Sequence, residues 1–272
     1  MEKIEFESPS LVERIKGMLG VDFYRLFHTP VFYIFLVISA IIPAMVLGMT
    51  GIEDASGAIT PLYTNTWQII ASSEPMYAVK SIAEYANMNM VFIFGGIMIS
   101  IFIGHDYKSG YVKQLFTTHP KKQDYVISKT LLGAFSMACM CITYLLGGFF
   151  AGLICGYSMD VNIGSLICAI LGKIIMSLGW ASLYTFLNVL FRKFFGISIA
   201  SSFFLGTGIL IIGVGSIVGN SALLNLFLYG SSVYACLSAN FVTVIVCLVC
   251  SLAWTLIYNL MGTAVLSKCD VY

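Results

Sequence analysis

Charged residues are scarce in this chain of 272 residues, where aspartate, glutamate, lysine and arginine together make up 10%. A soluble domain usually carries about a quarter. Apolar residues account for 59% of the chain, and the mean hydropathy is +0.93. This composition excludes a soluble globular protein and predicts an all-α, polytopic membrane protein with one transmembrane domain over residues 1–272. Since there is no acidic or basic tail, we expect no nucleic-acid partner.

The sequence also lacks the motifs of nucleotide-binding and hydrolytic enzymes. Gly172 and Lys173 are adjacent, but no glycine stands five residues before Gly172, and no serine or threonine follows Lys173. The phosphate-binding pattern GxxxxGK[ST] is therefore absent. Neither HExxH nor GxSxG occurs, and no span holds a pair of carboxylates for acid–base chemistry. We expect no catalytic residue, no cofactor and no metal in this chain, and no ATP hydrolysis by the chain itself.

No disulfide or metal pattern is evident among the eight cysteines and three histidines. Most cysteines lie inside apolar runs, where a thiol behaves as a small hydrophobe. Cys247 and Cys250 form a CxxC, but no second pair accompanies it. The histidines stand at the predicted membrane edges, and an interfacial role is favoured.

The first 30 residues predict a cytoplasmic leader. They hold five acids and no early apolar core, so they do not resemble a cleavable signal peptide. Residues 8–27 predict an amphipathic helix, in which Ser10 and Glu13 form a capping box. Phe23, Tyr24 and Phe27 favour a position in the membrane interface.

Long apolar runs predict six transmembrane helices, since about 20 helical residues cross a bilayer core. The run over residues 163–191 is too long for a single span of that length. Pro43 is expected to kink the first span. The predicted spans are 31–50, 88–104, 130–156, one within 163–191, 196–218 and 241–266.

Residues 219–239 are apolar but contain several asparagines and serines, which are costly against lipid. They predict a re-entrant hairpin on the outer side, before the last helix. Gly215 and Gly219 form a GxxxG pattern, a candidate for close helix contact.

Lysine and arginine give the orientation, because they are enriched in cytoplasmic loops. All but Lys80 and Lys173 of the 14 lysines and arginines fall on the side of the leader and of residues 105–129. Both termini are therefore expected in the cytoplasm. We expect a multi-pass protein of a bacterial plasma membrane.

The longest polar interruption between apolar runs is HDYKSGYVKQLFTTHPKKQDYVISK, residues 105–129. Residues 111–116 predict a short helix that ends before Pro120, since proline disfavours helix in the preceding residue. Its apolar stripe consists of Tyr111, Val112, Leu115 and Phe116. We expect this helix to lie along the membrane face with a basic flank.

This loop resembles the intracellular loop of ABC-2 type transporter permeases. The shared pattern is an acid and a glycine after a span, a short apolar helix, a proline turn, and an aromatic residue and a lysine leading into the next span. The residues that match it are Asp106, Gly110, Val112, Leu115, Phe116, Pro120, Tyr125 and Lys129. In that family the loop couples the permease to a cytoplasmic ATPase subunit that binds MgATP. The resemblance implies that Tyr111, Val112, Leu115 and Phe116 form the ATPase-coupling contact.

Lys173 is the ionisable residue that most closely approaches membrane depth. One interpretation places it in a translocation pathway, where it would attract an anionic part of a substrate. The other lets it snorkel to the outer headgroups, because about 27 Å of helix separates it from Phe191. Snorkelling is favoured.

The resemblance implies the transmembrane subunit of an ABC exporter that pairs with a like or related permease in the lipid bilayer. Bacterial peptides, antibiotics, lipids or polysaccharide precursors all fit as substrates. Two alternatives stay open, an integral membrane enzyme and a membrane assembly or sensor protein without transport activity.

Overall fold

The computed structural model describes residues 10–49, 51–53, 59–61, 65–70, 89–118, 121–208, 226–237 and 240–268. Within these ranges the chain is predominantly helical, and five helices are long and apolar enough to cross a membrane. They are α2 (Pro30–Met49), α4 (Met90–Lys108), α6 (Lys122–Cys155), α7 (Ile163–Leu190) and α12 (Phe241–Ser267). The prediction of a helical, multi-pass membrane protein is confirmed in this form.

The sixth predicted span, residues 196–218, is described only in part. Helix α8 (Phe195–Gly206) covers its first half and has 12 residues, which is shorter than a bilayer core requires. Residues 209–219, which include the GxxxG pattern of Gly215 and Gly219, lie outside the described residues. The count of six spans stays a prediction.

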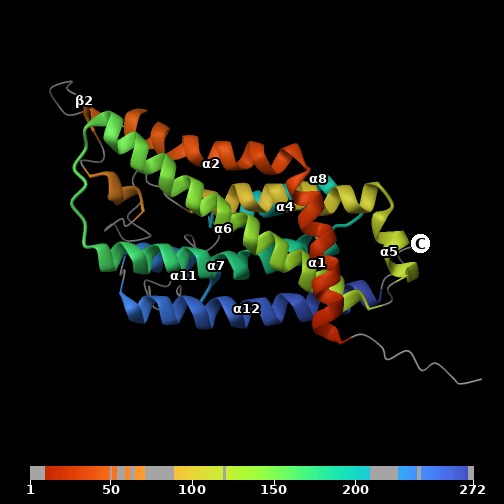
Figure 1. Ribbon diagram of the computed structural model, residues 1–272. Helices are drawn as coiled ribbons and strands as arrows, with labels where there is room; N and C mark the ends of the chain where they lie inside the picture. Colours follow the sequence, from red (N-terminus) through yellow and green to blue (C-terminus); the bar gives the residue numbers. More distant parts are fainter. Residues whose placement is uncertain are drawn as a thin grey trace, which may run out of the picture.

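The long helices form a bundle in which α6 packs against α2 and α7, and α12 covers α7 (Figure 1). Helix α7 is one continuous helix of 28 residues, which is longer than the roughly 20 residues that one span requires, as expected from the sequence. Helix α6 has 34 residues, about 51 Å at 1.5 Å per residue, whereas a bilayer core is about 30 Å thick. Part of α6 therefore extends beyond the hydrocarbon layer.

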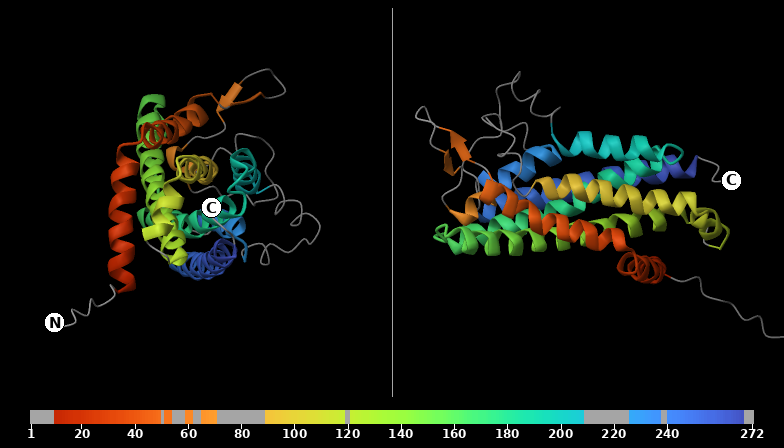
Figure 2. Two further views of the ribbon diagram at one scale, coloured as in Figure 1. Left: turned by 90° about the vertical axis from the view of Figure 1, so that its right-hand side faces the viewer. Right: turned by 90° about the horizontal axis from the view of Figure 1, so that it is seen from above.

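Helix α1 (Leu11–Phe27) lies across the long helices instead of alongside them (Figures 1 and 2). The predicted capping box is confirmed: the Ser10 backbone N–H donates to Glu13 Oε2 at 2.8 Å, and the Glu13 N–H donates to Ser10 Oγ at 3.3 Å. These two bonds satisfy backbone and side-chain groups at the helix start. The Ser10 hydrogen bonds lower the pKa of the exposed Glu13 carboxyl.

The end of the bundle that holds α1 also holds α5 (Tyr111–Thr118) and the end of α12 (Figure 1). The opposite end holds the strands β1 (Gly51–Glu53) and β2 (Ile59–Pro61), which pair antiparallel, and the 3-10 helix η1 (Thr66–Ile69). There the Trp67 Nε1–H donates to the Met159 carbonyl at 3.1 Å.

Helix α11 (Leu228–Leu237) is the described part of the predicted hairpin, and it packs against α7 and α12. Its Ser231 and Ser232 are buried inside the protein. This agrees with the argument that serine is costly against lipid. The preceding residues 219–225 lie outside the described residues, so the hairpin itself stays a prediction.

Candidate functional site

The loop between α4 and α6 contains the predicted short helix. Helix α5 begins at Tyr111 and ends at Thr118, close to the expected bounds 111–116. Gly110 precedes it with φ 75°, a backbone conformation that favours glycine. The predicted proline turn at residue 120 lies outside the described residues.

A buried cluster of four charges joins the ends of α4 and α6 to α1. Lys129 Nζ on α6 lies 2.6 Å from Asp22 Oδ1 on α1 and 2.7 Å from Asp106 Oδ2 on α4. Arg25 on α1 pairs with Asp106 as well. Both carboxylates are 0% exposed, so this part of the chain holds two acids and two bases in mutual contact. We call these residues the charge cluster.

Neighbouring side chains add hydrogen bonds to both carboxylates of the charge cluster. Ser128 Oγ–H donates to Asp22 Oδ2 at 2.8 Å, and the Tyr125 hydroxyl donates to Asp106 Oδ2 at 3.4 Å. The Arg25 guanidinium lies over the Tyr111 ring of α5, 4.2 Å from its centroid. Buried charges are stable only when they are paired and hydrogen-bonded in this way.

The pKa shifts at the charge cluster follow from burial and from these charges. Burial alone would lower the pKa of Arg25, but the hydrogen bond and charge of Asp106, with the charge of Asp22, raise it above its ordinary value. Burial raises the pKa of Tyr111, and the negative charge of Asp22 adds to this rise. Arg25 therefore stays charged, and Tyr111 stays neutral, at physiological pH.

Two further contacts fasten neighbouring helices near the charge cluster. Arg14 Nε on α1 donates to Asp124 Oδ2 on α6 at 2.7 Å. The Lys122 ammonium donates to the Leu266 carbonyl, near the end of α12, at 2.9 Å. Helices α1, α4, α6 and α12 are thus connected at one end of the bundle.

The four predicted coupling residues all lie on α5, and their stripe faces the protein. Val112 is 1% exposed and packs in an apolar cluster. Leu115 and Phe116 are half-buried against the same cluster, and the Phe116 ring meets the Tyr125 ring edge-on with centroids 5.7 Å apart. Val112 is thus packed inside the protein, and the coupling role of the four residues stays a prediction. The other members of this cluster are Met18, Tyr125, Val126, Val189 and Leu266.

The face of α5 that solvent can reach is polar. Lys113, Gln114 and Thr117 are its exposed residues. Because the apolar stripe of α5 packs inward, these three polar side chains face outward.

Lys173 does not snorkel, and the favoured interpretation is wrong. Its side chain is 0% exposed within the bundle. The ammonium donates to the Ser232 carbonyl at 2.6 Å and to the Asn89 side-chain oxygen, and it lies 5.7 Å from the Phe92 ring centroid. Both acceptors belong to the protein, so the ammonium is hydrogen-bonded inside the bundle.

Sequence reasoning missed the part that α1 plays in the charge cluster. Arg14, Asp22 and Arg25 recur on the same face as the buried Met18, which places charges on the packed side of the helix. This spacing of charged residues along the buried face could have indicated that α1 forms buried ion pairs. Their partners stand about a hundred positions later, so the sequence did not identify them.

Comparison with models of known protein families and with curated protein sequences finds no match. Among the described residues, no group of three or more histidines, cysteines, aspartates or glutamates could hold a metal ion. The geometry of the α5 end is therefore the basis for a functional proposal.

Proposed function

We propose that this chain is the transmembrane subunit of an ATP-driven exporter of the ABC-2 type. A separate cytoplasmic subunit would bind and hydrolyse MgATP. The chain itself would supply half of the translocation pathway, and a like or related permease would supply the other half.

The observation that carries this proposal is the attachment of α5. The helix connects α4 to α6, and its apolar stripe packs in a cluster with residues of α1, α6, α7 and α12. The charge cluster then joins α4 and α6 to α1. A displacement of α5 by a partner would thus move three helices together, because a buried ion cluster resists separation.

The course of the helices supports six crossings with both termini in the cytoplasm. Helices α7 and α12 both end at the bundle end that holds α5 (Figure 1). The chain must therefore return to the opposite end between residues 190 and 241, and α8 begins that return. With lysine and arginine enriched at the α5 end, this end is the cytoplasmic one in our proposal.

Two variants of α5 separate docking from transmission. Lys113→Glu reverses an exposed charge on the polar face, and we expect the ATPase subunit to be lost from the complex. Phe116→Ala removes a half-buried ring that contacts Tyr125, and we expect the ATPase to stay bound while its turnover no longer drives transport. Lys16→Glu, at an exposed site on α1, is the matched control.

The measurement is affinity purification of the tagged chain from native membranes. An ATPase subunit with a Walker A motif should accompany wild type and Lys16→Glu. If no such subunit accompanies the wild-type chain, the proposal fails.

A further inference from the structure

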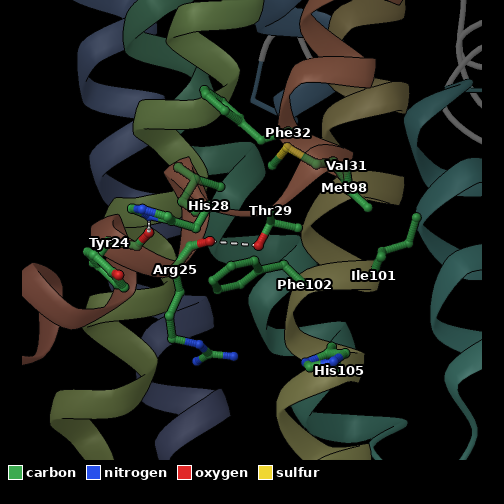
Figure 3. Close-up of a pocket in the computed structure, with 11 residues that line it drawn as sticks. Tyr24, Arg25, His28, Thr29, Val31, Phe32, Met98, Ile101, Phe102 and His105 are labelled. Carbon is green, nitrogen blue, oxygen red and sulfur yellow. Dashed lines mark hydrogen bonds between the residues drawn. The ribbon is translucent and has the colours of Figure 1, made fainter.

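A cavity of about 320 Å³ opens between the end of α1, the start of α2 and the second half of α4 (Figure 3). This volume lies at the lower end of the range for small-molecule pockets. The cavity is at the α5 end of the bundle but is separate from the polar face of α5. It does not depend on an ATPase partner.

The lining changes from polar to apolar along the cavity. Arg25 and His105 lie at one end, whereas Phe32 and Met98 lie toward the other (Figure 3). His105 and Met98 are seven residues apart on α4, which is about 10 Å along the helix. His28 lies between the two ends (Figure 3). The cavity thus has a polar end and an apolar end. Their separation is similar to that between the phosphate of a phospholipid and the start of its acyl chains.

The polar end offers hydrogen-bond donors and no exposed acid. None of the described residues that line the cavity is acidic. Arg25 keeps 23% of its side chain exposed, whereas its partners Asp22 and Asp106 are 0% exposed. An anion at this end would therefore meet the guanidinium and not the carboxylates.

His105 can donate a hydrogen bond at the polar end, and His28 lines the cavity between the two ends. The His28 Nδ1–H donates to the Tyr24 carbonyl at 2.7 Å, so Nε2 is the ring nitrogen that remains open to other partners. His28 and His105 are both exposed. Tyr24 stacks on His28 with ring centroids 4.0 Å apart and is 65% exposed, as expected for an aromatic residue at a membrane interface.

We propose that this cavity binds one anionic phospholipid of the adjacent leaflet. Arg25 and His105 hold its phosphate, and the start of an acyl chain lies along Val31, Phe32 and Met98. Basic pockets beside transmembrane helices are suited to anionic headgroups, and the apolar end gives the acyl chain a place that a free anion does not use. The bound phospholipid joins α1 to α4 next to the charge cluster.

The test is the thermal unfolding of the full chain, purified in a neutral detergent, with equal amounts of added phosphatidylglycerol or phosphatidylcholine. We expect phosphatidylglycerol to raise the Tm by roughly 5 °C more than phosphatidylcholine. The variant His28→Ala/His105→Ala should lose at least half of this difference, whereas Lys113→Ala, on the polar face of α5, should keep it.

Two further measurements distinguish the occupants. Ile101→Trp fills the cavity from α4 and should abolish the difference between the two phospholipids without changing the Tm in detergent alone. Equal Tm shifts with both phospholipids would show an apolar groove only and overturn the proposal. An equal shift with inorganic phosphate, or a full phosphatidylglycerol effect in the double histidine variant, would overturn it as well.

Discussion

Lys129 and Lys173 are both buried in the helical bundle, but their ammonium groups have different partners. Lys129 lies between two carboxylates, Asp22 and Asp106. Lys173 donates to a backbone carbonyl and a side-chain amide, and no described carboxylate forms an ion pair with it. Lys129 therefore belongs to a cluster of two acids and two bases, whereas the described partners of Lys173 are uncharged dipoles.

The difference separates a structural charge from a functional candidate. Lys129 is buried between two carboxylates, whose negative charges oppose the approach of an anionic substrate to its ammonium. Because no described carboxylate pairs with Lys173, its ammonium can still attract an anionic group, and buried cations in membrane proteins are costly unless they have a use. The comparison therefore favours Lys173 over Lys129 for the proposed pathway.

The largest effect is expected for Lys129→Met, which leaves two buried carboxylates with Arg25 alone. Removing one partner of a buried ion cluster costs about 3–5 kcal/mol. The Tm in detergent should fall sharply, and membrane abundance should fall with it. Lys113→Met, which removes an exposed lysine of α5, is the control and should change the Tm little.

A second substitution in the cluster checks the cause. Asp22→Asn on the Lys129→Met background removes one unpaired carboxylate and should restore part of the lost Tm. If Lys129→Met unfolds at the same temperature as Lys113→Met, the charge cluster does not connect the helices as described.

A smaller effect is expected for Lys173→Met. The substitution keeps the side-chain length but leaves the Ser232 carbonyl and the Asn89 side-chain oxygen without this donor, at a cost of about 1–3 kcal/mol. Membrane abundance should stay near normal, while transport-coupled ATPase activity of the complex should fall. A Tm loss as large as that of Lys129→Met would remove the distinction between the two lysines.

Local patterns predicted the local structure well. The capping box at Ser10 and Glu13 was correct, and α12 begins at the predicted Phe241 and ends one residue beyond the predicted 266. Helix α5 was found from its apolar stripe and its glycine. Each of these features depends on residues within a few positions of one another, so periodicity and capping rules suffice.

The contacts between residues far apart in the chain could not be predicted from the sequence. The carbonyl that holds Lys173 belongs to Ser232, 59 positions later, and Lys129 meets Asp22, 107 positions earlier. The number of helical residues between Lys173 and Phe191 predicts the depth of Lys173 in the membrane. It does not predict which face of α7 carries the side chain, so it cannot decide between contact with lipid and burial in the bundle. The apolar stripe of α5 was ambiguous in the same way, because packing and docking require the same residues.

The smallest effect is expected for Tyr111→Phe, which tests whether the charge cluster responds to ionisation of the ring above Arg25. Burial raises the pKa of Tyr111 above its ordinary value of 10.0, and the charge of Asp22 adds to the rise. A phenol with a raised folded-state pKa contributes stability that is fully present below the unfolded-state pKa and is lost as pH rises through the folded-state pKa. Wild type should therefore lose Tm above about pH 10 by an amount that Tyr111→Phe does not lose.

At pH 7 the two proteins should differ by less than about 0.5 kcal/mol, as is usual for a change that removes one partly exposed hydroxyl. The measurement is Tm in detergent from pH 7 to 11. Tyr24→Phe, which removes the hydroxyl of an exposed tyrosine on α1, controls for general alkaline effects such as lysine deprotonation. If Tyr111→Phe and Tyr24→Phe follow the same alkaline curve as wild type, the ring of Tyr111 is not coupled to the charges of Asp22 and Arg25. Helix α5 would then be attached by its apolar stripe alone, and the charge cluster would connect only α1, α4 and α6.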